Sequence, residues 1–169
     1  MNIGKPPEER RVGHRGITAF RGGYSARSGK IILMVTRRDK TLEELDGEVW
    51  GEPELDSYLV TTCHRLRRVP LRDFDVEDLR IMIGQGFSLD HLVPLAIEHL
   101  ERNPFAEGDF YPGDLLANVL GVEREFWVHR PELRQRMKAI AERASAGLDS
   151  LWMSDEIRVG LKGRLNAFG

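Results

Sequence analysis

The stretch Ser88-Leu-Asp-His-Leu-Val-Pro-Leu-Ala-Ile-Glu-His-Leu100 decides the fold class. Its apolar residues recur every three or four positions, as on one face of an α-helix: Leu89, Leu92, Val93, Ala96, Ile97 and Leu100. We expect Ser88 to open this helix and Asn103-Pro104 to end it. Because Pro94 lies too far inside to be a first-turn proline, we expect a kink or a later start there.

Two further helices are predicted upstream of this stretch. The first follows a cap in the dipeptide Asp56-Ser57 and is closed by Pro70. The second begins after Asp75 as N-cap and stops at Gly84-Gln-Gly86. The apolar face of the first helix contains Leu55, Leu59, Cys63 and Leu66.

The segments downstream show the same helical period. A short helix is expected over Leu115–Leu120 and one or two turns over Glu123–His129. Pro131 is well placed to start a longer helix that reaches Leu148, and a last amphipathic segment contains Ile157–Phe168. Strand alternation is hard to find, so we predict an all-α fold for residues 39–169, a compact irregular bundle of six or seven helices.

Length and composition restrict the class of protein. A chain of 169 residues has room for one domain with its own core. Its single cysteine, Cys63, excludes a disulfide scaffold and a cysteine zinc site, and it suits a reducing compartment. The longest apolar run, Ile31–Val35, is too short for a membrane span or a secretory signal. We therefore expect a cytoplasmic protein without membrane contacts.

The first residues differ from the rest of the chain. Residues 1–38 hold nine Lys or Arg against two Glu, many glycines and no helical or strand period. We expect a disordered, flexible basic extension, and three interpretations stay open: an over-extended start with Met34 as the native one, a tail without function, and an arm for nucleic acid. The third has little support, because Phe20 and Tyr24 are too few aromatic residues for base stacking.

The sequence offers little for catalysis or for cofactors. None of the five histidines has a metal-ligand spacing, and His91 and His99 are two helical turns apart, about 12 Å. Cys63 and His64 are adjacent, which on a helix turns their side chains about 100° apart. We expect no metal, no cofactor and no catalytic residues. A small enzyme built on Cys63, His64 or an acidic loop remains an alternative.

One acidic segment is the best candidate for partner binding. Asp39–Asp56 holds eight carboxylates against one lysine, and Trp50 lies within it. Acidic surfaces capture basic partners, although many charged runs are only solvated loops. The predicted contact residues are Glu44, Asp46, Glu48, Trp50, Glu52 and Glu54. A second candidate is the loop with Glu107, Asp109 and Asp114, whose plainer interpretation is a turn capped by Gly113 or Asp114 with Phe110 or Tyr111 buried.

Several stretches resemble a known family. The most specific are Leu79-Arg-Ile-Met-Ile-Gly-Gln85 and Gly108-Asp-Phe-Tyr-Pro-Gly-Asp-Leu-Leu116. The others are Thr41-Leu-Glu-Glu-Leu-Asp-Gly47, Ser57-Tyr-Leu-Val60, Leu66-Arg-Arg-Val-Pro-Leu71 and Leu92-Val-Pro-Leu-Ala96. From about Thr41 to about Leu133, the chain resembles the helical immunity proteins of contact-dependent growth inhibition (CDI) systems. Residues before Met34 lie outside the pattern, which favours the over-extended start.

The resemblance implies a non-catalytic inhibitor. Such a protein binds the C-terminal toxin domain delivered by a neighbouring cell, and many of these toxins are nucleases with basic clefts for phosphate. The acidic segments of this chain would complement such a cleft and steer fast capture. Plugging of the toxin active site and binding at an exosite both agree with this charge pattern. The sequence leaves the oligomeric state open.

Overall fold

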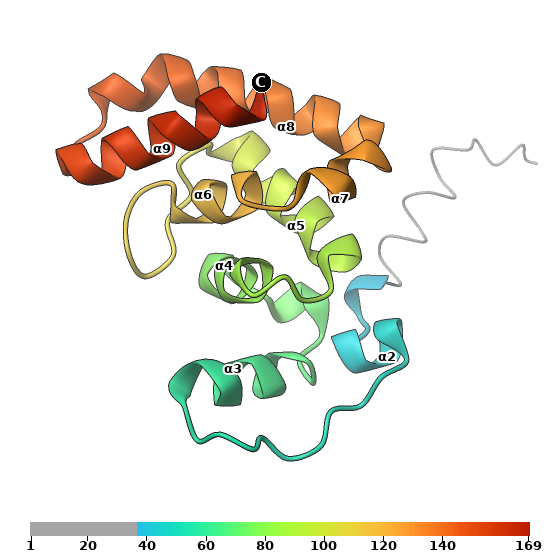
Figure 1. The fold of residues 1–169 in the computed structure, drawn as a ribbon. Coiled ribbons are helices and arrows are strands. Elements are labelled where there is room, and N and C mark those ends of the chain that lie inside the picture. Colours follow the sequence, from blue (N-terminus) through green and yellow to red (C-terminus); the bar gives the residue numbers. More distant parts are fainter. Residues whose placement is uncertain (1–36) are drawn as a thin grey trace, which may run out of the picture.

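The computed structural model describes residues 37–169 and shows an all-α fold (Figure 1). These residues form eight α-helices and two short 3-10 turns, with no strand among them. The predicted helical bundle is confirmed, with more helices than the six or seven expected. The basic extension and the alternative start at Met34 fall outside the described residues, apart from the last two positions of the predicted extension.

The unexpected helix is α2 (Leu42–Asp46), which lies inside the acidic segment. Thr41 caps it: its side chain accepts the Glu44 N–H, and the Glu44 carboxylate accepts the Thr41 N–H at 2.8 Å. Gly47 ends it in the left-handed conformation, with φ of 71°. Leu42 is fully buried and Leu45 packs partly buried against the core, so both apolar side chains of this short helix attach it to the bundle.

Helices α3 (Tyr58–Leu66) and α4 (Val76–Gly84) follow the capping signals in the sequence, with the 3-10 turn η1 (Leu71–Asp73) between them. Ser57 caps α3, and Asp75 caps α4. The predicted apolar face of α3 is wrong at one end: Leu55 lies before the helix and is 67% exposed. The cap at Ser57 starts the helix too late to include it.

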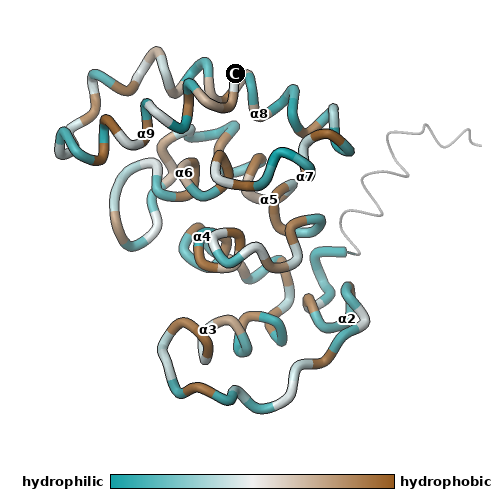
Figure 2. Tube along the Cα trace, viewed as in Figure 1, coloured by the Kyte–Doolittle hydropathy of each residue, from teal (hydrophilic) through white to brown (hydrophobic). Residues whose placement is uncertain are grey.

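Helix α5 (Leu89–Arg102) contributes more to the core than its neighbours α3 and α4. It begins directly after Ser88 and ends before Asn103, as predicted. The alternative of a later start is wrong, because Pro94 lies inside the continuous helix. Five of its apolar residues are completely buried: Leu92, Val93, Ala96, Ile97 and Leu100. Figure 2 shows hydrophobic positions recurring along α4, α5 and α6 in the middle of the molecule.

The remaining elements follow α5 in the chain. They are α6 (Asp114–Leu120), α7 (Arg124–Val128), α8 (Pro131–Gly147), the 3-10 turn η2 (Leu148–Ser150) and α9 (Asp155–Phe168). Helices α8 and α9 lie side by side along this end, while α2, α3 and the loop between them form the opposite end (Figure 1). The acidic segment and the C-terminal helices are therefore far apart.

Candidate protein-binding site

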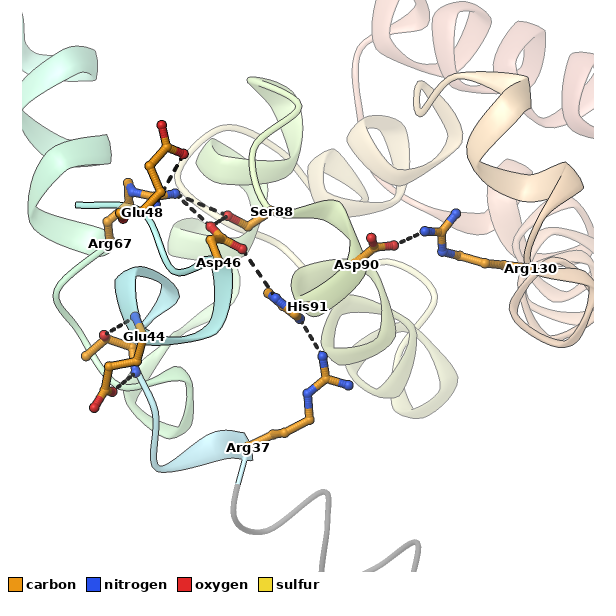
Figure 3. A network of polar contacts seen from close by, with 10 residues as sticks. Arg37, Glu44, Asp46, Glu48, Arg67, Ser88, Asp90, His91 and Arg130 are labelled. Atoms are coloured by element: carbon orange, nitrogen blue, oxygen red, sulfur yellow. Dashed lines mark hydrogen bonds and ion pairs between the residues drawn. The ribbon is translucent and has the colours of Figure 1, made fainter. Parts of the chain in front are cut away.

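A buried arginine fastens the acidic segment to the bundle. Arg67 follows the last turn of α3, and its side chain is only 2% exposed. Its Nη1 donates to Asp46 Oδ2 at 2.8 Å, and its Nη2 donates to the backbone carbonyl of Glu48 at 2.8 Å (Figure 3). The guanidinium also lies over the Trp50 ring, 4.3 Å from its centroid. One cation thus fixes three positions of the segment.

Two of the predicted contact residues serve the fold. Asp46 accepts a hydrogen bond from Ser88 Oγ at 2.7 Å and lies 3.3 Å from His91 Nε2, in addition to its bond with Arg67 (Figure 3). It therefore joins α2 to the ends of α3 and α5. The Glu44 carboxylate closes the capping box of α2. Neither side chain is as free for a partner as the sequence suggested.

Trp50 forms part of the wall of a groove. The indole makes edge-to-face contacts with His64 and Phe87, at centroid distances of 5.0 and 4.9 Å. Beside it lies a groove of about 520 Å³ between α3 and the loop that precedes it. We call this the acidic groove, and it is lined by Glu48, Val49, Trp50, Gly51, Glu52, Glu54, Leu55, Val60 and His64.

The carboxylates of the acidic groove differ in whether they have a cation nearby. Glu52 and Glu54 are exposed, and neither forms an ion pair with any residue that the structure describes. Glu48 is 69% exposed, with Oε2 3.9 Å from Arg67 Nη2. Of the six predicted contact residues, these three carboxylates face the solvent around the groove. Trp50 lies in the wall of the same groove.

The rim also carries apolar side chains that the sequence analysis did not single out as contacts. Val49 and Leu55 line the groove and are each at least two-thirds exposed, while Tyr58 and Leu59, at the start of α3, are 76% and 39% exposed. Large exposed apolar side chains next to charged groups mark protein interfaces. The signal for them was weak, because periodicity alone does not show where a helix begins.

The second candidate loop is built around a buried carboxylate. Asp114 is 1% exposed; its Oδ1 accepts the Gly108 N–H at 2.8 Å, and its Oδ2 accepts the Phe110 N–H at 3.2 Å. Gly113 caps α6, as the plainer interpretation predicted. That interpretation is wrong for Phe110, which is 69% exposed, while Tyr111 is half-buried. Glu107 and Asp109 are exposed.

The residues considered for catalysis do not converge. Cys63 is buried, and burial raises the pKa of its thiol, which disfavours the reactive thiolate. His64 packs against Trp50, and its Nδ1 is buried with no hydrogen-bond partner in the described part of the chain. Within residues 37–169, no group of three or more metal-ligating side chains is placed to hold a metal ion.

Two half-buried histidines make the stability depend on pH. Burial lowers the pKa of His91, with the charge of Arg37 adding to the effect, and burial likewise lowers the pKa of His99. The unfolded chain therefore binds protons that the folded chain resists, so the free energy of unfolding should fall as the pH drops below about 6.5. Urea unfolding at pH 7.5 and 5.5 should show this fall, with a smaller one in His91→Gln. An equal fall in both proteins would contradict the assignment.

The described residues define an all-α protein with an acidic groove whose lining includes exposed apolar side chains. A family model of CDI immunity proteins matches residues 44–137, more than half of the chain, and the chain belongs to this family. The match confirms the resemblance drawn from residues 41–133. A search of curated protein sequences gave no match. Among residues 37–169, no helix has the length and apolar character to cross a membrane.

Proposed function

We propose that this protein neutralises a cognate CDI toxin domain by binding it non-covalently through the acidic groove. Membership of the immunity family supports the toxin as partner. The observation that carries the choice of surface is the groove itself, with the free carboxylates of Glu52 and Glu54 beside exposed Val49 and Leu55. Inhibition of this kind requires no catalysis by the immunity protein.

The electrostatics favour a basic partner. Many carboxylates elsewhere are neutralised within the chain, among them Glu43 by Arg68, Glu77 by Arg80 and Glu101 by Arg136. The carboxylates of Glu52 and Glu54 lack such cations among the described residues, so their field extends into solvent. Unpaired surface charge of one sign raises association rates with an oppositely charged partner.

The acidic groove fits the surface of a nuclease. A nuclease domain needs a basic cleft for phosphate groups, and such a cleft would complement the groove in charge. The exposed apolar rim would supply the desolvated contacts that set a slow off-rate. We place this encounter in the cytoplasm, where a nuclease toxin meets its nucleic acid.

Reversing two charges tests this surface. The chain is co-expressed with the toxin domain encoded immediately upstream, and association is measured at low and high salt. We expect Glu52→Lys with Glu54→Lys to slow association by about 10- to 100-fold at low salt and to weaken its salt dependence. The thermal unfolding of the free variant should change little, because both side chains are exposed.

A charge-matched control comes from the second candidate loop. Glu107→Lys with Asp109→Lys also reverses two exposed carboxylates and should leave association unchanged. If this control variant slows association and the groove variant does not, the second loop is the binding surface. If the unaltered chain forms no complex and does not rescue growth, the proposed function fails for this toxin.

A further inference from the structure

Trp152 is almost fully exposed to solvent, at the end of the molecule away from the acidic groove. Trp152, in the connection between η2 and α9, is 95% exposed. Its neighbours are fixed: the Leu151 carbonyl accepts a bond from Arg158 Nη2 at 2.8 Å, and Met153 packs against the core. The indole is therefore presented by an anchored backbone. An exposed, anchored aromatic side chain is typical of an interface.

Two carboxylates accompany this indole. Asp155 and Glu156 begin α9, and both are exposed. Neither forms an ion pair with another side chain in the described part of the chain. Trp152, Asp155 and Glu156 form what we call the acidic knob.

A groove of opposite charge lies at the other end of the same helix. It has a volume of about 360 Å³, and its aromatic residues Trp127 and Phe168 meet edge to face with centroids 5.1 Å apart. Arg124, Arg134 and Arg164 also line it. We call this set the basic groove.

The arginines of the basic groove have no carboxylate partners among the described residues. Arg124 and Arg134 form no ion pair with any described residue, and Arg164 donates to the backbone carbonyl of Ala117 at 3.2 Å. Other arginines of the bundle are paired with carboxylates, for example Arg72 with Asp39 and Arg136 with Glu101. The basic groove therefore calls for an anionic partner with an apolar or aromatic part.

We propose that the partner is a second copy of this chain, bound in a symmetric dimer through α9. Helix α9 has 14 residues, so the acidic knob and the basic groove are separated by about 20 Å along it. A twofold axis across the middle of α9 places each knob in the groove of the other copy. The two helices are then antiparallel, and the interface closes at two chains.

The chemistry of the two surfaces matches in this arrangement. The indole of Trp152 enters beside Trp127 and Phe168 and stacks against guanidinium groups, while Asp155 and Glu156 meet arginines. In between, α9 leaves open space at Gly160 and Gly163, where an added Cβ would meet nothing within 4 Å, and Val159 is 70% exposed there. The acidic groove lies at the other end of the molecule and stays open for a toxin (Figure 1).

Sedimentation velocity of the full chain measures the dimer. We expect a weak dimer with a dissociation constant on the order of micromolar and a mass that rises from one chain to two over roughly 1 to 200 µM. Trp152→Ala should weaken the dimer at least about tenfold. Tyr58→Ala, which removes another exposed aromatic side chain at the start of α3, should leave it unchanged.

A charge swap identifies the pairing. Asp155→Lys with Glu156→Lys in one protein, and Arg124→Glu with Arg134→Glu in another, should each abolish self-association. Their mixture should form a heterodimer, because both contacts then join opposite charges again. Circular dichroism of each variant confirms that it is folded. A monomer at about 200 µM, a mass beyond two chains, an unaffected Trp152→Ala dimer or a monomeric mixture would each overturn the proposal.

Discussion

Replacing Arg67 by alanine is expected to lower the free energy of unfolding by about 3 to 5 kcal/mol. The substitution removes a side chain that is 2% exposed and breaks its bonds to the Asp46 carboxylate and the Glu48 carbonyl. Asp46 is left in a partly buried site with weaker compensation from Ser88 and His91. Trp50 also loses the cation that lies over its ring. Urea unfolding measures the loss.

The adjacent arginine is the matched control. Arg68 pairs with Glu43 at 3.3 Å, and its side chain is 51% exposed, so Arg68→Ala should cost less than about 1 kcal/mol. Arg67→Met should be milder than Arg67→Ala, because it refills the volume. Equal stability of Arg67→Ala and Arg68→Ala would show that the buried network does not hold the fold.

Arg67 also links stability to binding. Because it fixes Asp46, Glu48 and Trp50, it holds the wall of the acidic groove in place without facing the solvent itself. A partner that needs Glu52 and Glu54 in a fixed arrangement would meet a looser segment in Arg67→Ala.

Much of the fold could be predicted because its helices have strong local signals. Ser57 and Asp75 cap helices where the sequence indicated, and five of the six apolar positions predicted to face inward from α5 are fully buried. Helix α2 was missed because five residues are too few to show a period. Its signal was present as a capping box, Thr41 with Glu44 three residues later, followed by Gly47.

The candidate site was predictable only as a segment. Composition located the acidic run, but the direction of each carboxylate depends on partners distant in sequence. Asp46 turns inward because it accepts hydrogen bonds from Arg67 and Ser88. These partners lie 21 and 42 residues away in the chain. Glu52 and Glu54 have no such partners among the described residues and stay outward. A charge count cannot separate these two cases.

The two most specific motifs of the family resemblance have structural roles. Gly84 lies where an added Cβ would come 2.6 Å from the Asn118 side chain, so it allows α4 and α6 to approach closely. Arg80 of the same motif donates two bonds of 2.6 Å to Glu77. These two motifs hold the helical scaffold of this chain together, and none of their residues lines the acidic groove.

The second large effect is expected at Asp114, which holds the other motif together. Asp114→Ala should lower the free energy of unfolding by about 3 to 5 kcal/mol. It removes a buried carboxylate that accepts the N–H groups of Gly108 and Phe110 and lies 3.9 Å from Arg80 Nε. Two backbone donors would lose their acceptor, and Arg80 would lose a nearby negative charge while it keeps its bonds to Glu77. Urea unfolding again gives the magnitude.

Asp109, an exposed carboxylate in the same motif, provides the control for the buried carboxylate of Asp114. Its side chain is exposed, and only its backbone N–H takes part in the loop, donating to Glu77 at 3.0 Å. Asp109→Ala should therefore change the stability by no more than about 0.5 kcal/mol. Asp114→Asn keeps an acceptor oxygen but loses the charge near Arg80, so it should fall between the two alanine variants. If Asp114→Ala is as stable as Asp109→Ala, the turn does not depend on the buried carboxylate. The exposed carboxylates of this loop would then again be candidates for the binding surface.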